Sequence, residues 1–215
     1  MAMPVALLTD AGGAHLSAYL PALAASDEIS RISIGDPSGH VFENAKAALG
    51  DKLAATYRDS AELLAKEKPA LVLVSQEAAT SPPVIDAALE AGCHVMAEKP
   101  SCIRAEDFAK LATKADSKHR LLMLALANRV RPEVMFARKL LAAGTLGTVY
   151  GLELHIIADQ TRLTRPSYHK QWFADKQRAG GGHLIWLGIH WLDLVMFLTG
   201  SAVSEVAGFT ANVGG

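Results

Sequence analysis

The chain has 215 residues, of which 50% are hydrophobic and 20% charged, and its formal net charge is −1. This composition is typical of a globular protein of one or two domains. Binding to nucleic acid or to an acidic membrane surface rests on clustered Lys and Arg, and the chain has no basic excess, so neither is expected. Cys93 and Cys102 lack metal-ligand spacing, which predicts no metal site and two thiols of a reducing compartment.

The N-terminus lacks the basic and apolar regions of a signal peptide. The longest apolar run, 183–199, contains two histidines and an aspartate, and we expect it to be too short and too polar to cross a bilayer. A cytoplasmic protein is therefore expected.

The first 127 residues alternate between short apolar runs and longer helical patterns. The runs predict strands at 5–9, 29–36, 70–75, 94–100 and 121–127. The intervening patterns predict helices ending near residue 25 and spanning 41–49, 60–66, 82–92 and 105–117, with 54–59 as a link. Uncharged strands separated by helices of this length are typical of a parallel sheet covered on both faces.

A different organisation follows residue 127. We expect a helix over 131–147, a half-buried strand over 148–158, a long polar loop over 159–179, a glycine-led helix and a final strand over 204–213. Two strands and two helices are hard to close into a domain. The sequence therefore predicts an incomplete C-terminal α/β domain with an open sheet.

The turn after the first strand, TDAGGA (9–14), occupies the place of the phosphate-binding G-x-G-x-x-G pattern. Only its last position fits, and Gly12 and Gly13 fall one or two places away. Asp36 ends the second strand, where an acid can bind the ribose of NAD and would repel the 2′-phosphate of NADP. The alternatives are an ordinary strand-to-helix turn and a solvated aspartate before Pro37.

The tripeptide Glu98-Lys99-Pro100 follows a predicted strand at the sheet edge where such folds bind ligands. A desolvated lysine there can bind a substrate hydroxyl or transfer a proton. The alternative is a surface turn.

The stretch GGGHLIWLGIHWLDL (180–194) carries two histidines and an aspartate in an apolar segment. On a regular helix His183, Trp186, His190, Asp193 and Phe197 share one face. The opposite face is then apolar, with Leu184, Leu187, Trp191, Leu194 and Leu198. Polar groups on a buried face need partners, so this face is either one wall of a site or a set of satisfied core residues.

Together these stretches resemble the Gfo/Idh/MocA oxidoreductases, the family of glucose-fructose oxidoreductase and inositol dehydrogenase. The resemblance covers nearly the whole chain and rests on residues 87–100, 131–151 and 172–200. The last stretch is similar to the family pattern G-G-G-x-L-x-D-x-G-x-H-x-x-D through Gly180, Gly181, Gly182, Leu184, Gly188, His190 and Asp193.

The resemblance implies an NAD(P)-binding Rossmann domain over 1–127 and a partial substrate and oligomerisation domain over 128–215. It implies hydride transfer between a nicotinamide and a sugar or polyol, with NAD favoured over NADP and Lys99 and His190 as catalytic residues. The expected cofactor-binding residues are Asp10, Ala11, Gly12, Gly13, Ala14, Asp36, Ser75, Gln76, Glu98 and Lys99. The expected substrate-binding residues are Lys99, Arg129, Trp172, Trp186, His190 and Asp193. A homo-oligomer is expected where the C-terminal sheet is completed.

The chain departs from the family pattern at three places. Trp186 stands where the family has an aspartate, the glycine turn is irregular, and Gln76-Glu77-Ala78 replaces the family's Thr-Pro-Asn. Trp186 is therefore a core aromatic, a stacking platform for a sugar ring, or the mark of an altered reaction. The alternative function is a non-catalytic ligand- or nucleotide-binding protein.

Overall fold

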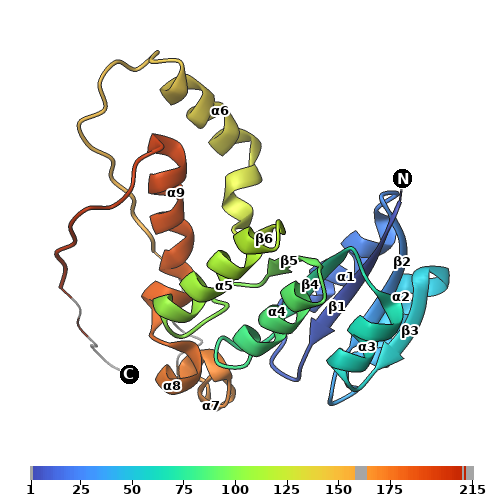
Figure 1. The fold of residues 1–215 in the computed structure, drawn as a ribbon. Coiled ribbons are helices and arrows are strands. Elements are labelled where there is room, and N and C mark those ends of the chain that lie inside the picture. The colour runs from blue at the N-terminus through green and yellow to red at the C-terminus, as the bar shows by residue number, and fades with distance from the viewer. Residues whose placement is uncertain (1, 158–163, 210, 212–215) are drawn as a thin grey trace.

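The computed structural model describes residues 2–157, 164–209 and 211 (Figure 1). Six parallel strands form one sheet in the order β3-β2-β1-β4-β5-β6. The strands are β1 Met3–Thr9, β2 Ile29–Gly35, β3 Leu53–Tyr57, β4 Leu71–Ser75, β5 His94–Ala97 and β6 Leu122–Leu124. The chain order reverses between β1 and β4, so their carboxyl ends flank the crevice where open α/β sheets bind ligands.

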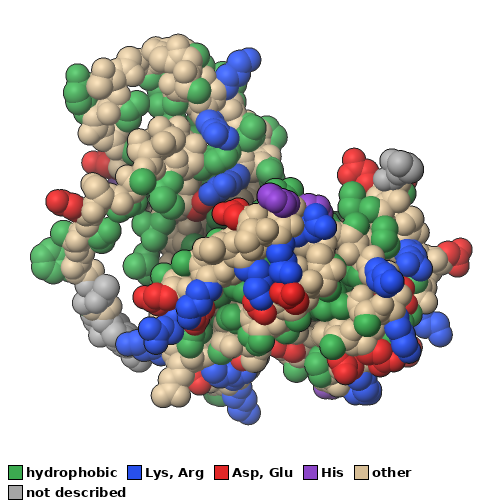
Figure 2. Space-filling model, viewed as in Figure 1, with side chains coloured by type: hydrophobic (Ala, Val, Ile, Leu, Met, Phe, Trp, Pro, Cys, Tyr) green, Lys and Arg blue, Asp and Glu red, His purple; other side chains and the backbone are tan. Residues whose placement is uncertain are grey.

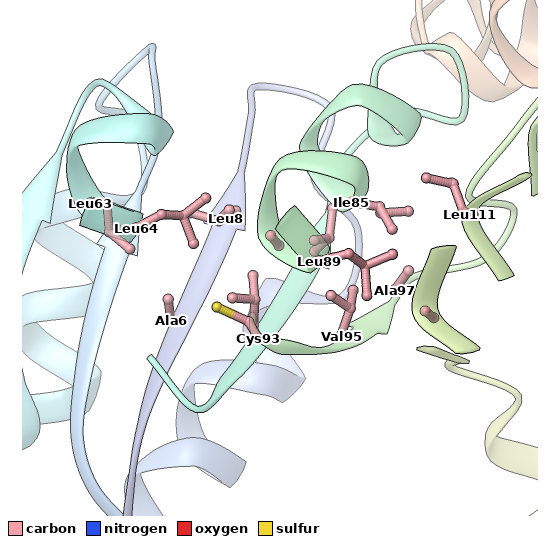
Figure 3. Packing of buried hydrophobic residues seen from close by; sticks show 14 residues of the cluster. Ala6, Leu8, Leu63, Leu64, Ile85, Leu89, Cys93, Val95, Ala97 and Leu111 are labelled. Atoms are coloured by element: carbon pink, nitrogen blue, oxygen red, sulfur yellow. The ribbon is translucent and has the colours of Figure 1, made fainter. Parts of the chain in front are cut away.

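Helices cover both faces of this sheet, as the uncharged strands predict (Figure 1). The helices are α1 Leu16–Ala25, α2 Phe42–Leu49, α3 Ser60–Glu67, α4 Ser81–Glu90 and α5 Ala105–Ser117. On one face Leu8 and Val74 pack with residues of α3, α4 and α5, including Ile85 and Leu111 (Figure 3). On the other face Leu7 packs with residues of α1 and α2.

Local signals agree with the ends of several helices. The Asp59 side chain accepts hydrogen bonds from the backbone N–H groups of Ala61 and Glu62 and caps α3. The helix α9 Ile189–Thr199 ends at Gly200, which has a left-handed φ of 68° that suits glycine.

The link predicted over 54–59 is wrong, because residues Leu53–Tyr57 form the edge strand β3. The exposure of this strand alternates along its length, whereas the central strands β1 and β4 are almost continuously buried. An edge strand of five residues with alternating exposure therefore resembles a connecting segment in the sequence.

After β6 the regular structure of the described residues is helical, and the described parts of the two strands predicted there form no strand. The helices are α6 Pro132–Ala142, α7 Pro166–His169, α8 Lys176–Ala179 and α9, with a π-helix at Leu184–Gly188. Among the described residues, 148–157 and 204–209 have no strand assignment. Their alternating side chains find no neighbouring strand, and Tyr150 and Ile157 stay almost fully exposed. Hydrophobic side chains are correspondingly visible over this part of the chain in Figure 2.

The predicted loop over 159–179 is also partly wrong, because its described part, from residue 164 on, holds two short α-helices and a 3-10 helix, Trp172–Ala174. The stretch Lys176–Thr199, which holds α8, the π-helix and α9, is long and apolar enough to cross a membrane by length and composition alone. A core helix of a soluble protein meets the same criteria. Asp193 of this stretch is buried and ion-paired with Arg129.

Candidate functional site

The turn between β1 and α1 is packed closely against the end of β4. A Cβ atom on Gly13 would lie 2.0 Å from Thr9 Oγ1 and 2.7 Å from the carbonyl oxygen of Ser75, so only glycine fits there. Ser75 Oγ donates a 2.7 Å hydrogen bond to the Ala14 carbonyl oxygen, and Gln76 Nε2 donates one of 3.2 Å to that of Thr9. The irregular glycine turn is thus a well-defined structure.

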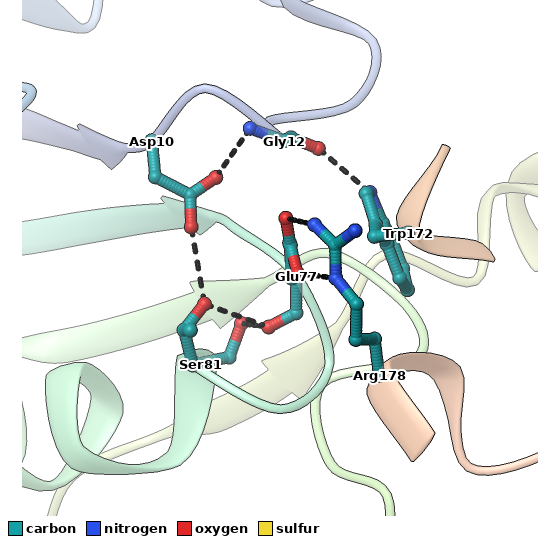
Figure 4. A network of polar contacts seen from close by, with 7 residues as sticks. Asp10, Gly12, Glu77, Ser81, Trp172 and Arg178 are labelled. Carbon is teal, nitrogen blue, oxygen red and sulfur yellow. Dashed lines mark hydrogen bonds and ion pairs between the residues drawn. The ribbon is translucent and has the colours of Figure 1, made fainter. Parts of the chain in front are cut away.

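A second layer of contacts joins this turn to the C-terminal part of the chain (Figure 4). Asp10 Oδ1 accepts a 2.8 Å hydrogen bond from the Gly12 N–H. Trp172 Nε1 donates one of 2.9 Å to the Gly12 carbonyl oxygen. Arg178 binds the Glu77 carboxylate through two hydrogen bonds, with Nε at 2.8 Å from Oε2. Residues 172–178 therefore lie directly against the predicted nucleotide turn.

Asp36 is buried directly after β2, and its carboxylate already accepts hydrogen bonds from several donors. Its carboxylate accepts hydrogen bonds from the Ser38 N–H (2.9 Å), the Ser38 hydroxyl (2.7 Å) and the Val41 N–H (3.1 Å). These bonds lower the pKa of Asp36 although burial opposes them. The Asp36 carboxylate therefore stabilises the turn that follows it. Asp36 also lines a cavity of about 430 Å³, together with Ala11, Gly13 and Leu16.

Lys99 is buried after β5, and its ammonium lies against Trp186. Lys99 Nζ donates a 2.9 Å hydrogen bond to the Trp186 carbonyl oxygen and lies 4.4 Å from the centre of its ring. Burial lowers the pKa of Lys99, and the nearby Glu98 opposes the shift. A carbonyl dipole and an aromatic ring thus stand where a carboxylate would pair with the lysine.

Trp186 belongs to an aromatic cluster. Its ring stacks on that of Phe173 at 4.6 Å between centroids and meets that of Trp172 edge to face at 5.2 Å. With Phe173 and the Lys99 ammonium already against the indole, the structure favours the core-aromatic interpretation of Trp186 over that of a sugar-stacking platform.

The carboxylate of Glu98, next to Lys99 in the chain, is held by two side chains of the α1 region. His15 Nδ1 is 2.8 Å from Glu98 Oε1, and the Tyr19 hydroxyl donates a short hydrogen bond to the same oxygen. Glu98 Oε2 accepts a 2.9 Å hydrogen bond from the backbone N–H of Lys99. This cluster fixes the peptide that carries the lysine.

Together with Lys99, His190 lines a cleft of about 770 Å³ between α1, the ends of β5 and β6, and α9. Its Nδ1 atom is buried without a hydrogen-bond partner. Burial lowers the pKa of His190, and the charge of Lys99 lowers it further. A neutral imidazole that lines this cleft can accept a proton from a polar ligand there.

Arg129 and Asp193, both predicted to bind substrate, bind each other. Arg129 Nε donates a 2.7 Å hydrogen bond to Asp193 Oδ2, and its Nη2 donates a shorter one to Oδ1. The pair joins the 3-10 helix Ala127–Val130 to α9 and orients the helix that carries His190. A role in substrate binding stays a prediction.

The helical face predicted for residues 183–197 is only partly formed, because Leu184–Gly188 is a π-helix with a different angular spacing. Asp193 and Leu194, which were expected on opposite faces, are both buried. Leu184 of the expected apolar face is 59% exposed. His190 lines the cleft beside Lys99 and Asp193 pairs with Arg129, whereas on the expected apolar face Leu184 is exposed and Leu194 is buried.

The structure brings most of the predicted site residues to one edge of the sheet. The carboxyl ends of β1, β4 and β5 carry the nucleotide turn, Ser75, Gln76, Glu98 and Lys99. Trp172 lies against the nucleotide turn. Sequence reasoning missed His15, Tyr19, Phe173 and Arg178. His15 and Tyr19 are four residues apart, a helical spacing that could have revealed them, whereas the loop residues gave no such signal.

These residues fit a nicotinamide dinucleotide. Among the described side chains, two buried polar atoms have no hydrogen-bond partner, Gln76 Oε1 and His190 Nδ1, and both belong to predicted site residues. Asp36 and the first turn would hold the adenosine end, and the cleft of Lys99 and His190 would hold the reacting end. No group of three or more described His, Cys, Asp or Glu side chains is arranged to hold a metal ion.

Comparison with known proteins finds relatives among oxidoreductases and dehydrogenases. The chain is 34% identical over 151 residues to an uncharacterised oxidoreductase of Schizosaccharomyces pombe, covering 70% of this chain and 40% of that protein. It is 33% identical over 115 residues to D-glucoside 3-dehydrogenase of Escherichia coli, covering 53% of this chain and 31% of the relative. The chain thus spans less than half the length of these two relatives.

The fold is also that of a solved structure, scyllo-inositol dehydrogenase from Lactobacillus casei with bound NAD(H) and scyllo-inositol. The TM-score is 0.77 at 18% identity, over 93% of this chain and 57% of that one. The model of the oxidoreductase family with an NAD-binding Rossmann fold matches residues 11–126, and that of the GFO/IDH/MocA C-terminal domain matches 134–215. The six-stranded sheet and both family matches together place this chain in the GFO/IDH/MocA family of oxidoreductases.

Proposed function

We propose that this protein binds NAD(H) and transfers a hydride between the nicotinamide and a carbon of a sugar or polyol derivative. The observation that carries the proposal is the pairing of Lys99 with His190 in one cleft, where the buried His190 Nδ1 has no hydrogen-bond partner. Two groups able to move a proton thus face the space in which a hydroxyl would react.

In the proposed reaction the bound nicotinamide supplies the hydride acceptor. The substrate hydroxyl loses a proton as its carbon is oxidised, so a base must lie beside it. Because burial lowers the pKa values of both Lys99 and His190, their uncharged forms become more accessible near neutral pH. Lys99 would hold the hydroxyl and His190 would accept its proton.

Asp36 supports NAD as the cofactor rather than NADP. Its hydrogen-bonded carboxylate has a lowered pKa and stays ionised, so it would repel a 2′-phosphate. Asp36 Oδ2 accepts one hydrogen bond, from the Val41 N–H, and a carboxylate oxygen can accept a further bond from a ribose hydroxyl.

One observation favours the alternative, a non-catalytic nucleotide- or ligand-binding protein. Lys99 Nζ is already bonded to the Trp186 carbonyl oxygen and covered by its ring. A lysine held in this way lacks the carboxylate that would orient it or exchange protons with it. Cofactor binding without turnover is the outcome that this alternative predicts.

The test begins with fluorescence titration of the purified chain with NADH and NADPH. We expect saturable NADH binding, weaker NADPH binding, and a loss of that preference in Asp36→Asn, which keeps an acceptor for the Ser38 bonds. Thermal unfolding of the variant must match that of wild type. Absence of nucleotide binding to folded protein would refute the proposal.

Turnover is then measured with NAD and a panel of sugars and polyols. Wild-type activity that falls by orders of magnitude in Lys99→Met and His190→Asn, with NADH affinity retained, would support catalysis. NADH binding without turnover of any panel member would favour the non-catalytic alternative.

We also propose that the protein is cytoplasmic and binds neither nucleic acid nor membrane. Where its C-terminal sheet is completed, we propose that it forms a homo-oligomer, which sedimentation tests.

A further inference from the structure

Three charged side chains meet at the nucleotide turn. Asp10 and Glu77 are acids on the two segments that follow β1 and β4, and Arg178 is a base on α8 (Figure 4). Arg178 holds Glu77 through both guanidinium contacts, and a Cβ atom on Gly12 would lie 2.5 Å from Glu77 Cγ. Glu77 is therefore in direct contact with the turn.

The carboxylates of Asp10 and Glu77 would disfavour binding of a diphosphate at this turn. A dinucleotide places two negative charges near this turn, and fixed carboxylates close to it would repel them. Asp10 also occupies the Gly12 N–H, a donor of the kind that anions use, and has no ion-pair partner among the described residues. Without a nearby cation, the turn would carry a charge of −2 before any ligand bound.

We propose that Arg178 is a positioning residue for the cofactor diphosphate: it neutralises Glu77, and so allows a glycine turn that contains Asp10 to accept the ligand. This inference rests on the proposed binding of NAD(H). The chain supplies the cation from α8, which Trp172 helps to hold against the turn through its bond to the Gly12 carbonyl oxygen.

The geometry suits this role better than that of a surface ion pair. The Glu77 side chain is only 14% exposed and that of Arg178 is 42% exposed. The guanidinium therefore reaches from solvent to a nearly buried carboxylate at the ligand-binding edge. Because it is only partly covered, it can also act on charge in the crevice.

The test measures NADH affinity by fluorescence titration in wild type, Arg178→Ala, Arg178→Lys and the double variant Glu77→Gln/Arg178→Ala. We expect Arg178→Ala to weaken NADH binding at low salt by about tenfold, the effect of one lost charge near the ligand. The double variant should recover most of the affinity, because it removes the acid that needed neutralising. Lys176→Ala removes an exposed charge from the same helix and is the matched control.

The outcomes separate this inference from the proposed function. If wild type fails to bind NADH, the proposed function fails and this inference fails with it. If wild type binds and Arg178→Ala binds equally well, only the inference is overturned. A loss in Arg178→Ala that Glu77→Gln does not rescue would show a structural contact rather than neutralisation. An effect that persists undiminished at high salt would contradict the electrostatic account.

Discussion

The ion pair between Arg129 and Asp193 predicts an asymmetric response to mutation. The Asp193 side chain is 6% exposed, whereas that of Arg129 is 44% exposed. Arg129→Gln would leave a buried carboxylate without its cation, which costs about 3–5 kcal/mol of unfolding free energy. Asp193→Asn would leave a guanidinium that reaches water, so mainly hydrogen bonds are lost, at about 1–2 kcal/mol.

Urea unfolding of both variants, followed by circular dichroism, measures this difference. With a denaturant slope of about 2 kcal/mol/M, a difference of about 2 kcal/mol separates the two midpoints by about 1 M. Arg129→Gln should have the lower midpoint, and the double variant should be more stable than the sum of the two losses implies. Equal midpoints, or a lower one for Asp193→Asn, would refute the reasoning from burial.

Other variants test the turn, the histidine and the aromatic cluster. Gly13→Ala should destabilise the fold by about 1–3 kcal/mol and abolish NADH binding, because its Cβ would lie 2.0 Å from Thr9 Oγ1. The control is Gly182→Ala, whose Cβ meets nothing within 4 Å and which should keep the stability and the NADH affinity of wild type. Burial lowers the pKa of His190, so the unfolded chain binds its proton first and stability should fall as pH drops below 6.5. Thermal unfolding of His190→Asn as a function of pH should lack this fall in stability. A pH dependence equal to that of wild type would contradict the assignment to His190. Trp186→Asp should lower the unfolding free energy by about 3–5 kcal/mol through loss of the aromatic cluster, and wild-type stability in this variant would argue against a core role.

Much of the nucleotide-binding half could be predicted from the sequence because its strands are buried on both faces. Runs such as 70–75 are apolar throughout, and a helix of suitable length follows each of them. The edge strand Leu53–Tyr57 escaped because its exposure alternates and its length is that of a connection. The strand predicted over 148–158 has the alternation of a strand, but a strand also needs a hydrogen-bonded neighbour, which no periodicity can supply. The described part of this segment shows none.

The site shows the same division. The position of Lys99 could be predicted, because it follows a parallel strand and such strands end at one edge. The contacts of Trp172 and Arg178 could not, since they come from a polar stretch without periodicity and join residues more than 100 positions apart. The partner of Trp186 was equally hidden, because Phe173 lies in that same stretch.

Because Leu184–Gly188 is a π-helix, the geometry of this site depends on the number of residues in that turn. A π turn accommodates about one residue more than an α turn, so it is geometrically equivalent to one extra residue in the helix register. Deleting Ile185 would restore an α turn and rotate the preceding residues by about 100° relative to α9. Residues before Ile185, such as Gly182, would then keep their identities but lose their orientation relative to His190. Relatives that differ by one residue here would present different surfaces to the cleft even where every aligned residue is the same.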